Sequence, residues 1–204
     1  MMDEGGFAVA GGQDLKDGVW LNEPKVWSLK DGVLDVVTDA ETDFWRETHY
    51  GFTHDNGHLF GVPARNAFTA ELRVRGDYRA LYDQAGIMVR LDERRWVKAG
   101  IELSDGRAML SSVLTDGRSD WATGTYEDDP RDFRIRATVA DGVLRLQVSA
   151  DGRLWPLTRL APFPVAKTYS VGPMCCSPTR AGLKVHFSEF QLGTPLGKDL
   201  HDLS

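Results

Sequence analysis

The chain has 204 residues and a formal net charge of −6, and 42% of its residues are hydrophobic and 26% charged. This balance is typical of a globular domain with a packed core and excludes wholesale disorder. Because Arg94-Arg95 is the longest basic run, we expect neither nucleic acid nor an anionic membrane as the main partner; both require a basic patch.

The start of the chain, MMDEGGFAVAGG, lacks the basic and long apolar stretches of a secretion signal. No apolar run approaches the ~20 residues of a membrane-spanning helix, so we expect a cytoplasmic protein. The two cysteines, Cys175 and Cys176, are adjacent in the sequence. Neighbours on a strand point to opposite faces, so a disulfide between them would be strained, and we expect two reduced, half-buried thiols.

Turn signals recur along the chain. Asp-Gly occurs at 17–18, 31–32, 105–106, 116–117, 141–142 and 151–152. This dipeptide favours hairpin turns, because Gly accepts a positive φ and Asp hydrogen-bonds its own backbone. Between the turns, apolar and polar residues alternate over 33–38, 68–75, 133–139 and 144–149, and a closing strand is expected over 183–190.

Together these signals predict an all-β, jelly-roll β-sandwich of two antiparallel sheets with roughly 12 strands. Helix should be marginal, because no window of 11 or more residues shows a 3.6-residue apolar period. We divide the chain into an N-terminal arm (1–17), a single sandwich domain (18–192) and a loosely held polar tail (193–204).

The segment 42–61, TDFWRETHYGFTHDNGHLFG, is dense in aromatic, imidazole and carboxylate groups. If residues 44–50 are extended, Trp45, Glu47 and His49 share one face. Aromatic rings stack on sugar rings while nearby polar groups bond the hydroxyls, so this face could bind a sugar. The alternative is that Trp45 packs in the core or at its rim and that the polar groups cap a loop.

The segment 83–103, DQAGIMVRLDERRWVKAGIEL, predicts two alternating strands joined by a short charged turn. One face is apolar and belongs to the core. The other carries Gln84, Met88, Arg90, Trp96, Lys98 and Glu102. A large aromatic on a polar sheet face indicates a ligand or a partner, whereas a salt-bridged, solvent-facing sheet is the alternative.

Metal and catalytic signals are weak. His49, His54, Asp55 and His58 lie close in sequence but lack helical ligand spacing, so no transition metal is expected. No cofactor is expected either, although a structural calcium ion could use Asp43 or Asp55 with backbone carbonyls. There is no Gly-x-Ser-x-Gly elbow, no phosphate-binding glycine loop and no Glu-x-Asp-x-Glu strand of the kind that sandwich-type glucanases use. Glu47 and Glu102 remain as weak candidates for an acid/base pair.

Several long motifs of this chain resemble the domain-of-unknown-function family 1349, some of whose members carry a "regulation of enolase" label. They are WLNEP (20–24), TDFWRETHYGF (42–52), DNGHLF (55–60), YDQAGIMVRLDERRWVKAGIE (82–102), SDW (119–121) and VGPMCCSP (171–178). The resemblance spans roughly residues 18–192 and implies a concanavalin A-like lectin/glucanase fold, whose relatives bind glycans on a concave sheet. It supplies no catalytic residues.

We therefore expect a non-catalytic, lectin-like domain that binds a sugar or oligosaccharide on the concave sheet. Trp45 and Trp96 would stack on the ring, and the two cations among the polar candidates favour an acidic sugar. The polar candidates are Glu47, His49, Gln84, Arg90, Lys98 and Glu102. The alternatives are a glycan-active enzyme on the same face, and a protein-interaction module such as a homodimer, with Trp96 and Trp121 as interface anchors.

Overall fold

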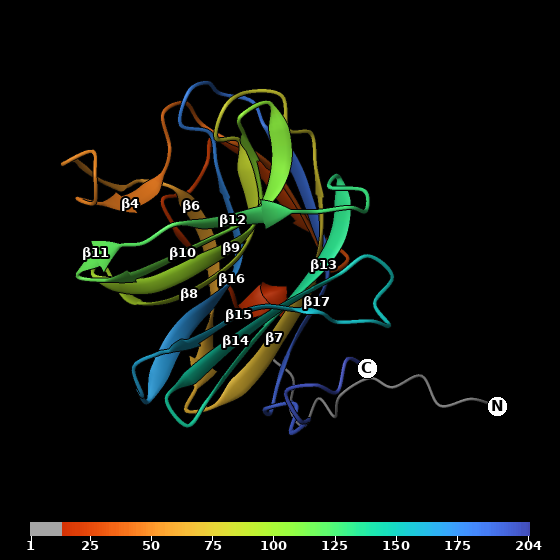
Figure 1. Ribbon diagram of the computed structural model, residues 1–204. Helices are drawn as coiled ribbons and strands as arrows, with labels where there is room; N and C mark the ends of the chain where they lie inside the picture. Colours follow the sequence, from red (N-terminus) through yellow and green to blue (C-terminus); the bar gives the residue numbers. More distant parts are fainter. Residues whose placement is uncertain (1–13) are drawn as a thin grey trace.

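The computed structural model describes residues 14–204, which fold into two large antiparallel sheets packed face to face (Figure 1). The prediction of an all-β sandwich is confirmed. Within the described residues the helical structure is one short 3₁₀ turn, η1 (Leu15–Asp17). Residues 1–13 of the predicted arm lie outside the described residues.

The first sheet has eight strands in the order β1-β6-β16-β8-β9-β10-β11, and β12 pairs with β10 beside β11. Its strands are β1 (Val19–Leu21), β6 (His58–Arg65), β8 (Gln84–Asp92), β9 (Arg95–Ser104), β10 (Arg107–Asp116), β11 (Arg118–Ser119), β12 (Ala122–Thr125) and β16 (Thr168–Cys176). The predicted hairpin over 83–103 is therefore β8 and β9, at the centre of this sheet.

The second sheet has seven strands in the order β15-β14-β13-β7-β17-β3-β2. They are β2 (Val26–Lys30), β3 (Val33–Val37), β7 (Phe68–Gly76), β13 (Asp132–Ala140), β14 (Val143–Ser149), β15 (Leu157–Pro162) and β17 (Lys184–Gly193). A separate hairpin consists of β4 (Phe44–Arg46) and β5 (Thr53–Asp55). The described chain thus has 17 strands, more than expected, because several are only two to four residues long.

Three of the Asp-Gly turns have the geometry that their sequence predicts. In Asp31-Gly32, Asp105-Gly106 and Asp141-Gly142 both residues have a positive φ, from 51° to 77°. A positive φ at both central residues defines the type I′ turn, whose twist matches that of the strands it joins. The local chemistry of Asp and Gly is therefore sufficient to place these hairpins.

The main core lies between the two sheets. Alternate residues of β8 and β9, such as Ile87, Val89 and Val97, point into it and are at most 1% exposed. A second apolar cluster lies on the outer face of the eight-stranded sheet and consists of Phe44, Trp45, Leu59, Met88, Trp96, Val113, Met174 and Cys176. Figure 1 shows β4 beside this sheet, on the side away from β7 and β14. The β4–β5 hairpin thus supplies the cover for this second cluster.

The adjacent cysteines belong to different clusters. Cys175 faces the main core and Cys176 faces the second cluster, as strand alternation requires. Both are free, as predicted, but they are at most 1% exposed and not half-buried. The hairpin cover explains this difference at Cys176, because the outer sheet face on which its side chain lies is not open to solvent.

The C-terminal segment is held more closely than its polar composition predicts. The Arg145 guanidinium donates to the carbonyl oxygens of Lys198 (3.1 Å) and Asp199 (3.3 Å). The Trp155 backbone N–H donates to the Leu203 carbonyl at 2.8 Å. These bonds attach the tail to β14 and to the loop that follows it. Within residues 14–204, no helix has the length and apolar character to cross a membrane.

Candidate functional site

A cavity of about 430 Å³ opens on the outer face of the eight-stranded sheet, beside the β4–β5 hairpin. Its volume lies in the range of about 300–1,000 Å³ that is usual for small-molecule sites. Five aromatic side chains line it: Trp45, Tyr50, Phe52, Tyr82 and Trp121. Polar side chains also line it, chiefly Glu41, Asp43, His54, Gln84, Lys98 and Glu102. The lining therefore combines rings and hydrogen-bonding groups.

Strands β8 and β9 supply the floor of the cavity, because alternate residues of both point to this face. The cross-strand pairs along it are Gln84 with Glu102, Gly86 with Gly100, and Met88 with Lys98. The two glycines face each other and leave no side chain between the other two pairs. Gln84, Lys98 and Glu102 are each at most 6% exposed. The floor is thus polar but almost completely removed from water.

A buried ion pair joins this floor to the hairpin. The Lys98 ammonium donates to Oδ1 of Asp43 at 2.7 Å, and the same oxygen accepts the Phe44 backbone N–H at 2.8 Å. Burial alone would lower the pKa of Lys98. Attraction to nearby negative groups, among them the Asp43 and Glu102 carboxylates, outweighs the effect of burial, so this pKa lies above its ordinary value. Lys98 therefore stays charged, and Asp43 balances that charge.

Glu102 belongs to a second hydrogen-bonded chain. Its Oε2 accepts a hydrogen bond from the Ser111 hydroxyl at 2.5 Å, and the Ser111 oxygen accepts one from the Trp121 indole N–H at 3.1 Å. Burial raises the pKa of Glu102, and the Asp43 carboxylate adds to the rise, while Lys98 and Ser111 oppose it. This chain fixes the Trp121 ring at the cavity wall through a carboxyl group on the floor.

The aromatic wall of the cavity is partly exposed. Tyr50 and Phe52 stack with ring centroids 5.2 Å apart, and Tyr50 meets Trp45 edge-on at 5.8 Å. On another part of the wall, Tyr82 and Trp121 meet edge-on at 6.3 Å. Tyr50, Phe52 and Trp121 are 40–49% exposed. Large aromatic side chains gathered at an open cavity indicate a site for a ligand or a partner.

The loop from Glu47 to Gly51 differs from the extended strand that we expected over 44–50. Glu47 and His49 have positive φ values of 61° and 62°, and the Gly51 N–H donates to the Glu47 carbonyl at 2.8 Å. The chain therefore turns after β4 and brings Tyr50 back onto Trp45. Glu47 and His49 do not share the Trp45 face and do not line the cavity.

Two arginines hold the hairpin in place. The Arg46 side chain donates to the carbonyl oxygens of Gly117 (3.3 Å) and Glu93 (3.4 Å), which lie in turns of the eight-stranded sheet. Arg90 on β8 makes two hydrogen bonds to the Asp55 carboxylate, at 2.7 and 2.8 Å. The hydrogen bonds of Arg46 fix β4 and those of Arg90 fix β5. The aromatic wall therefore has a defined position over the floor.

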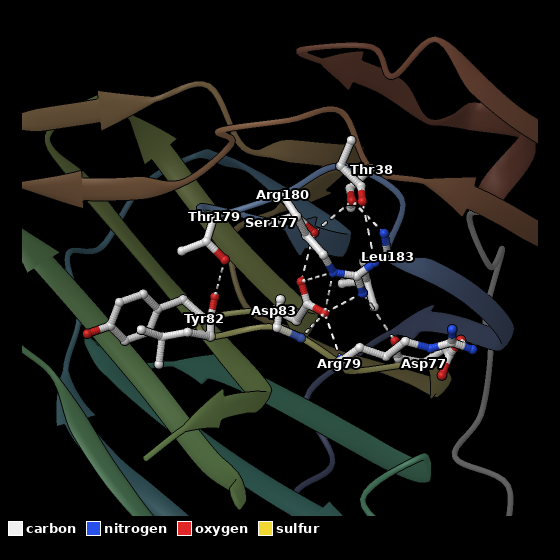
Figure 2. A network of polar contacts seen from close by, with 12 residues as sticks. Thr38, Asp77, Arg79, Tyr82, Asp83, Ser177, Thr179, Arg180 and Leu183 are labelled. Atoms are coloured by element: carbon white, nitrogen blue, oxygen red, sulfur yellow. Dashed lines mark hydrogen bonds and ion pairs between the residues drawn. The ribbon is translucent and has the colours of Figure 1, made fainter. Parts of the chain in front are cut away.

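A buried carboxylate fixes the wall of the cavity opposite the hairpin, which includes Tyr82 and Thr179 (Figure 2). Asp83 is completely buried and accepts hydrogen bonds from the backbone N–H groups of Arg79 (2.9 Å) and Ala80 (3.0 Å). It also accepts from the Ser177 hydroxyl at 3.1 Å and from the Arg180 guanidinium. The network therefore joins the segment before β8 to the segment after β16, both of which reach the cavity.

Tyr82, next to Asp83, has a strained backbone. Its φ is +64°, which is rare for a bulky side chain. The Tyr82 N–H donates to the Leu103 carbonyl at 2.7 Å, and the Tyr82 carbonyl accepts from the Gln84 amide at 3.2 Å. Its interaction with the Tyr50 hydroxyl, together with burial, raises the pKa of Tyr82 to about 12. Tyr82 therefore presents a protonated phenol at the cavity.

The structure brings together only part of the predicted site. Four of the predicted residues line this cavity: Trp45, Gln84, Lys98 and Glu102. The stacking role of Trp96 is wrong, as is its role as an interface anchor: it is completely buried, with the Phe44 ring 6.0 Å away. No surface of its indole remains for a ligand or a second subunit.

Two further expected roles are also corrected. Arg90 is paired with Asp55 and does not line the cavity, so it is not a free cation for an acidic ligand. Glu47 lies in the exposed loop, with Arg46 at 3.8 Å and Arg118 at 3.9 Å. It therefore does not share the cavity with Glu102, and the expected acid/base pair is not assembled.

The candidate metal ligands have other partners. Asp43 pairs with Lys98, and Asp55 pairs with Arg90. Nε2 of His58 accepts the Asp39 backbone N–H, and its Nδ1 lies 2.7 Å from the Asn22 carbonyl oxygen. Among residues 14–204, no group of three or more His, Cys, Asp or Glu side chains is placed to hold a metal ion.

Several residues that line the cavity are not among the predicted site residues. They are Phe52, Tyr82, Thr179 and Glu41, and Trp121 is predicted only as an interface anchor. The density of rings in 42–61 was a usable signal for Phe52. Tyr82 and Thr179 gave none, because they reach the cavity through the buried Asp83 network.

Comparison with known proteins agrees with the family resemblance. A family model described as "Protein of unknown function (DUF1349)" matches residues 20–195. A Saccharomyces cerevisiae protein named "Regulation of enolase protein 1" is 61% identical over 191 residues, which is 94% of this chain and 96% of that protein. The resemblance predicted from the motifs is therefore confirmed.

Solved structures show the same fold. The crystal structure of a functionally unknown protein from Saccharomyces cerevisiae has a TM-score of 0.90 and 59% identity, covering 91% of this chain and all of that one. The Bacteroides ovatus protein "Xyloglucan PUL GH43B" has a TM-score of 0.67 at 15% identity and covers 90% of this chain but 39% of its own. At that identity the likeness concerns the fold alone.

We predict that Asp83→Ala lowers the free energy of unfolding by about 3–5 kcal/mol, because it leaves Arg180 and several buried donors without their acceptor. Urea unfolding at pH 7 measures the change. Asp77→Ala is the control, since Asp77 makes an ion pair with Arg79 near the start of the same segment but is much more exposed. Equal losses in the two variants would contradict the central role of Asp83.

We predict that Glu102→Gln raises the melting temperature at pH 7 but not at pH 4. The folded-state pKa of Glu102 is raised above its ordinary value of 4.5. Its stabilising contribution is therefore complete below pH 4.5 and is lost as the pH rises through the folded pKa. Glutamine stays neutral throughout and still offers an acceptor to Ser111.

Thermal unfolding at both pH values tests this prediction. Glu127→Gln, at an exposed position, should change the melting temperature little at either pH. A wild type that is more stable than Glu102→Gln at pH 7 would show that attraction to Lys98 outweighs the burial of the charge.

Proposed function

The chain belongs to the DUF1349 family of proteins of unknown function, and from its aromatic cavity we propose that it binds a sugar or oligosaccharide without cleaving it. One observation carries the proposal: five aromatic rings surround a floor whose polar groups are almost completely buried. Sugars present both an apolar ring face and many hydroxyls, so they match a lining of both kinds.

The aromatic wall and the polar floor of the cavity would have different roles in binding a sugar. Trp121 and Tyr50 offer partly exposed rings on which a pyranose could stack. Gln84, Lys98 and Glu102 on the floor would bond hydroxyls that enter between the rings. Buried polar groups of this kind discriminate strongly, because a ligand that lacks the matching hydroxyl leaves them without a partner.

The same geometry favours binding over hydrolysis. Glycoside hydrolysis needs two carboxyl groups on either side of the scissile bond. In this cavity Asp43 is held by Lys98 and by the Phe44 N–H, while Glu47 lies outside it. Glu41 lines the cavity but is exposed. Glu102 alone therefore has the buried, raised-pKa character of a general acid.

We predict that the chain binds at least one of cellotriose, xylotriose and maltotriose, and that Trp121→Ala weakens this binding at least tenfold. Loss of ring stacking and of the water-excluding wall is the physical cause, and tenfold corresponds to about 1.4 kcal/mol. Isothermal titration calorimetry at pH 7 measures the affinities.

Trp27→Ala is the matched control. Trp27 is 37% exposed and Trp121 is 40% exposed, but Trp27 lies on β2 of the other sheet and does not line the cavity. Its replacement should leave the affinity unchanged. Absence of heat with all three trisaccharides, or an equal loss in both variants, would argue against the sugar site.

A second candidate function comes from the yeast relative. A protein that is 61% identical over 94% of this chain is named for the regulation of enolase, which favours a shared role. In this case the exposed rings of Tyr50, Phe52 and Trp121 would form part of a protein-binding surface.

We predict for this role that the purified chain changes the rate of purified enolase at a saturating molar ratio, and that Tyr50→Ala with Phe52→Ala reduces the effect. Enolase turnover and co-elution in size-exclusion chromatography are the measurements. An unchanged rate and separate elution at micromolar concentrations would contradict direct regulation.

A further inference from the structure

The charges around the cavity do not match an acidic ligand. Both cations that favoured an acidic sugar are paired with aspartates: Arg90 with Asp55, and Lys98 with Asp43, each at 2.7 Å. Arg90 does not line the cavity. Three carboxylates line it (Glu41, Asp43 and Glu102), against the single ammonium of Lys98. Because Asp43 balances Lys98, the exposed Glu41 carboxylate makes the lining negative even when Glu102 is protonated.

The hydrogen-bonding atoms of the floor show the same bias. Among the described residues, Oε1 of Glu102, Oδ2 of Asp43 and Oε1 of Gln84 have no hydrogen-bond partner, although other atoms of the same groups do. Gln84 and Glu102 are more than nine-tenths buried and line the cavity. Acceptors that have no protein partner at a cavity favour a ligand that arrives with N–H or O–H donors.

The rings that surround this floor add to the attraction for a cation. The face of an aromatic ring is negative and attracts an ammonium within about 6 Å of the ring centroid. Tyr50, Phe52 and Trp121 are partly exposed at the cavity, while Glu41 at its edge makes no ion pair among residues 14–204. Rings and carboxylates therefore act in the same direction.

From these observations we propose that the cavity selects a sugar bearing a protonated amine over a neutral or an acidic one, an inference that rests on the proposed sugar binding. The ammonium would lie among Glu102, Asp43 and the ring of Trp121 and donate to the carboxylate oxygens that lack partners. A uronic acid would add a further negative charge beside these three carboxyl groups. An N-acetylated amine would lose both the charge and two of the donors.

Three trisaccharides with one β-1,4-linked backbone test the proposal, because they differ only at carbon 2. They are the fully deacetylated glucosamine trisaccharide, cellotriose and the tri-N-acetylated form. Calorimetric titration of the full chain at pH 6 should give an affinity for the amine form at least tenfold above that of the other two. In 1 M salt this ratio should fall, because screening weakens the charge interaction.

Carboxylate variants locate the effect. Glu41→Gln and Glu102→Gln should each lower the ratio of amine-form to cellotriose affinity, by about threefold or more. Glu127→Gln carries the same change in charge at an exposed position outside the cavity and should leave the ratio unchanged. An equal reduction in all three variants would show long-range attraction to an acidic protein and would overturn selection by the cavity.

The outcomes separate the two proposals. Equal affinity for the amine form and cellotriose, or tighter binding of the acetylated form, overturns the selection of an amine but leaves sugar binding intact. Binding of tetramethylammonium without any of the trisaccharides overturns sugar binding while charge selection stands. Absence of all binding overturns both.

Discussion

The ion pair between Lys98 and Asp43 is the contact on which the candidate site depends. Asp43 lies one residue before β4, and Lys98 lies on the central strand β9, so this pair fixes the start of the hairpin against the sheet. Phe44 can then cover Trp96, and Trp45 can form a wall of the cavity. Without that attachment, the outer face of the sheet would expose its apolar residues, and Lys98 would lose its carboxylate partner. The pair is an anchor for geometry more than a source of stability, since burying two charges costs about as much as their attraction returns.

The two walls of the cavity are positioned by different physical means. The hairpin wall depends on two arginines. Arg46 reaches from the hairpin to a carbonyl oxygen of the sheet, and Arg90 reaches from the sheet to the Asp55 carboxylate of the hairpin. The opposite wall depends on Asp83, which has no exposure to solvent and collects donors from two segments about 95 residues apart, as in its bond to Ser177. Glu102 connects the floor to Trp121 through Ser111. Such hydrogen-bonded networks hold rings in fixed positions, which lowers the entropy lost when a ligand binds.

The fold was readable from the sequence because its determinants are local. Alternation over 83–103 correctly separated Val97 from Lys98, and Asp-Gly pairs placed three hairpins. Alternation states which side chains share a face but not what covers that face. Alternation therefore predicts an open surface for Trp96, although Phe44, 52 positions earlier, covers it. It predicts a free cation at Arg90, because the partner Asp55 lies 35 positions away. Glu47, His49 and Tyr82 are non-glycine residues with positive φ and gave no turn signal.

The neighbouring thiols of Cys175 and Cys176 offer a way to watch the two apolar layers separately. One sulfur lies between the sheets and the other beneath the hairpin, and each is shielded from reagents only while its own layer stays closed. Hinge-like lifting of β4 and β5 would expose the second sulfur while the first stayed protected, whereas loss of the sandwich would release both. Alkylation kinetics at these adjacent positions would then distinguish local opening of the β4–β5 hairpin from global unfolding.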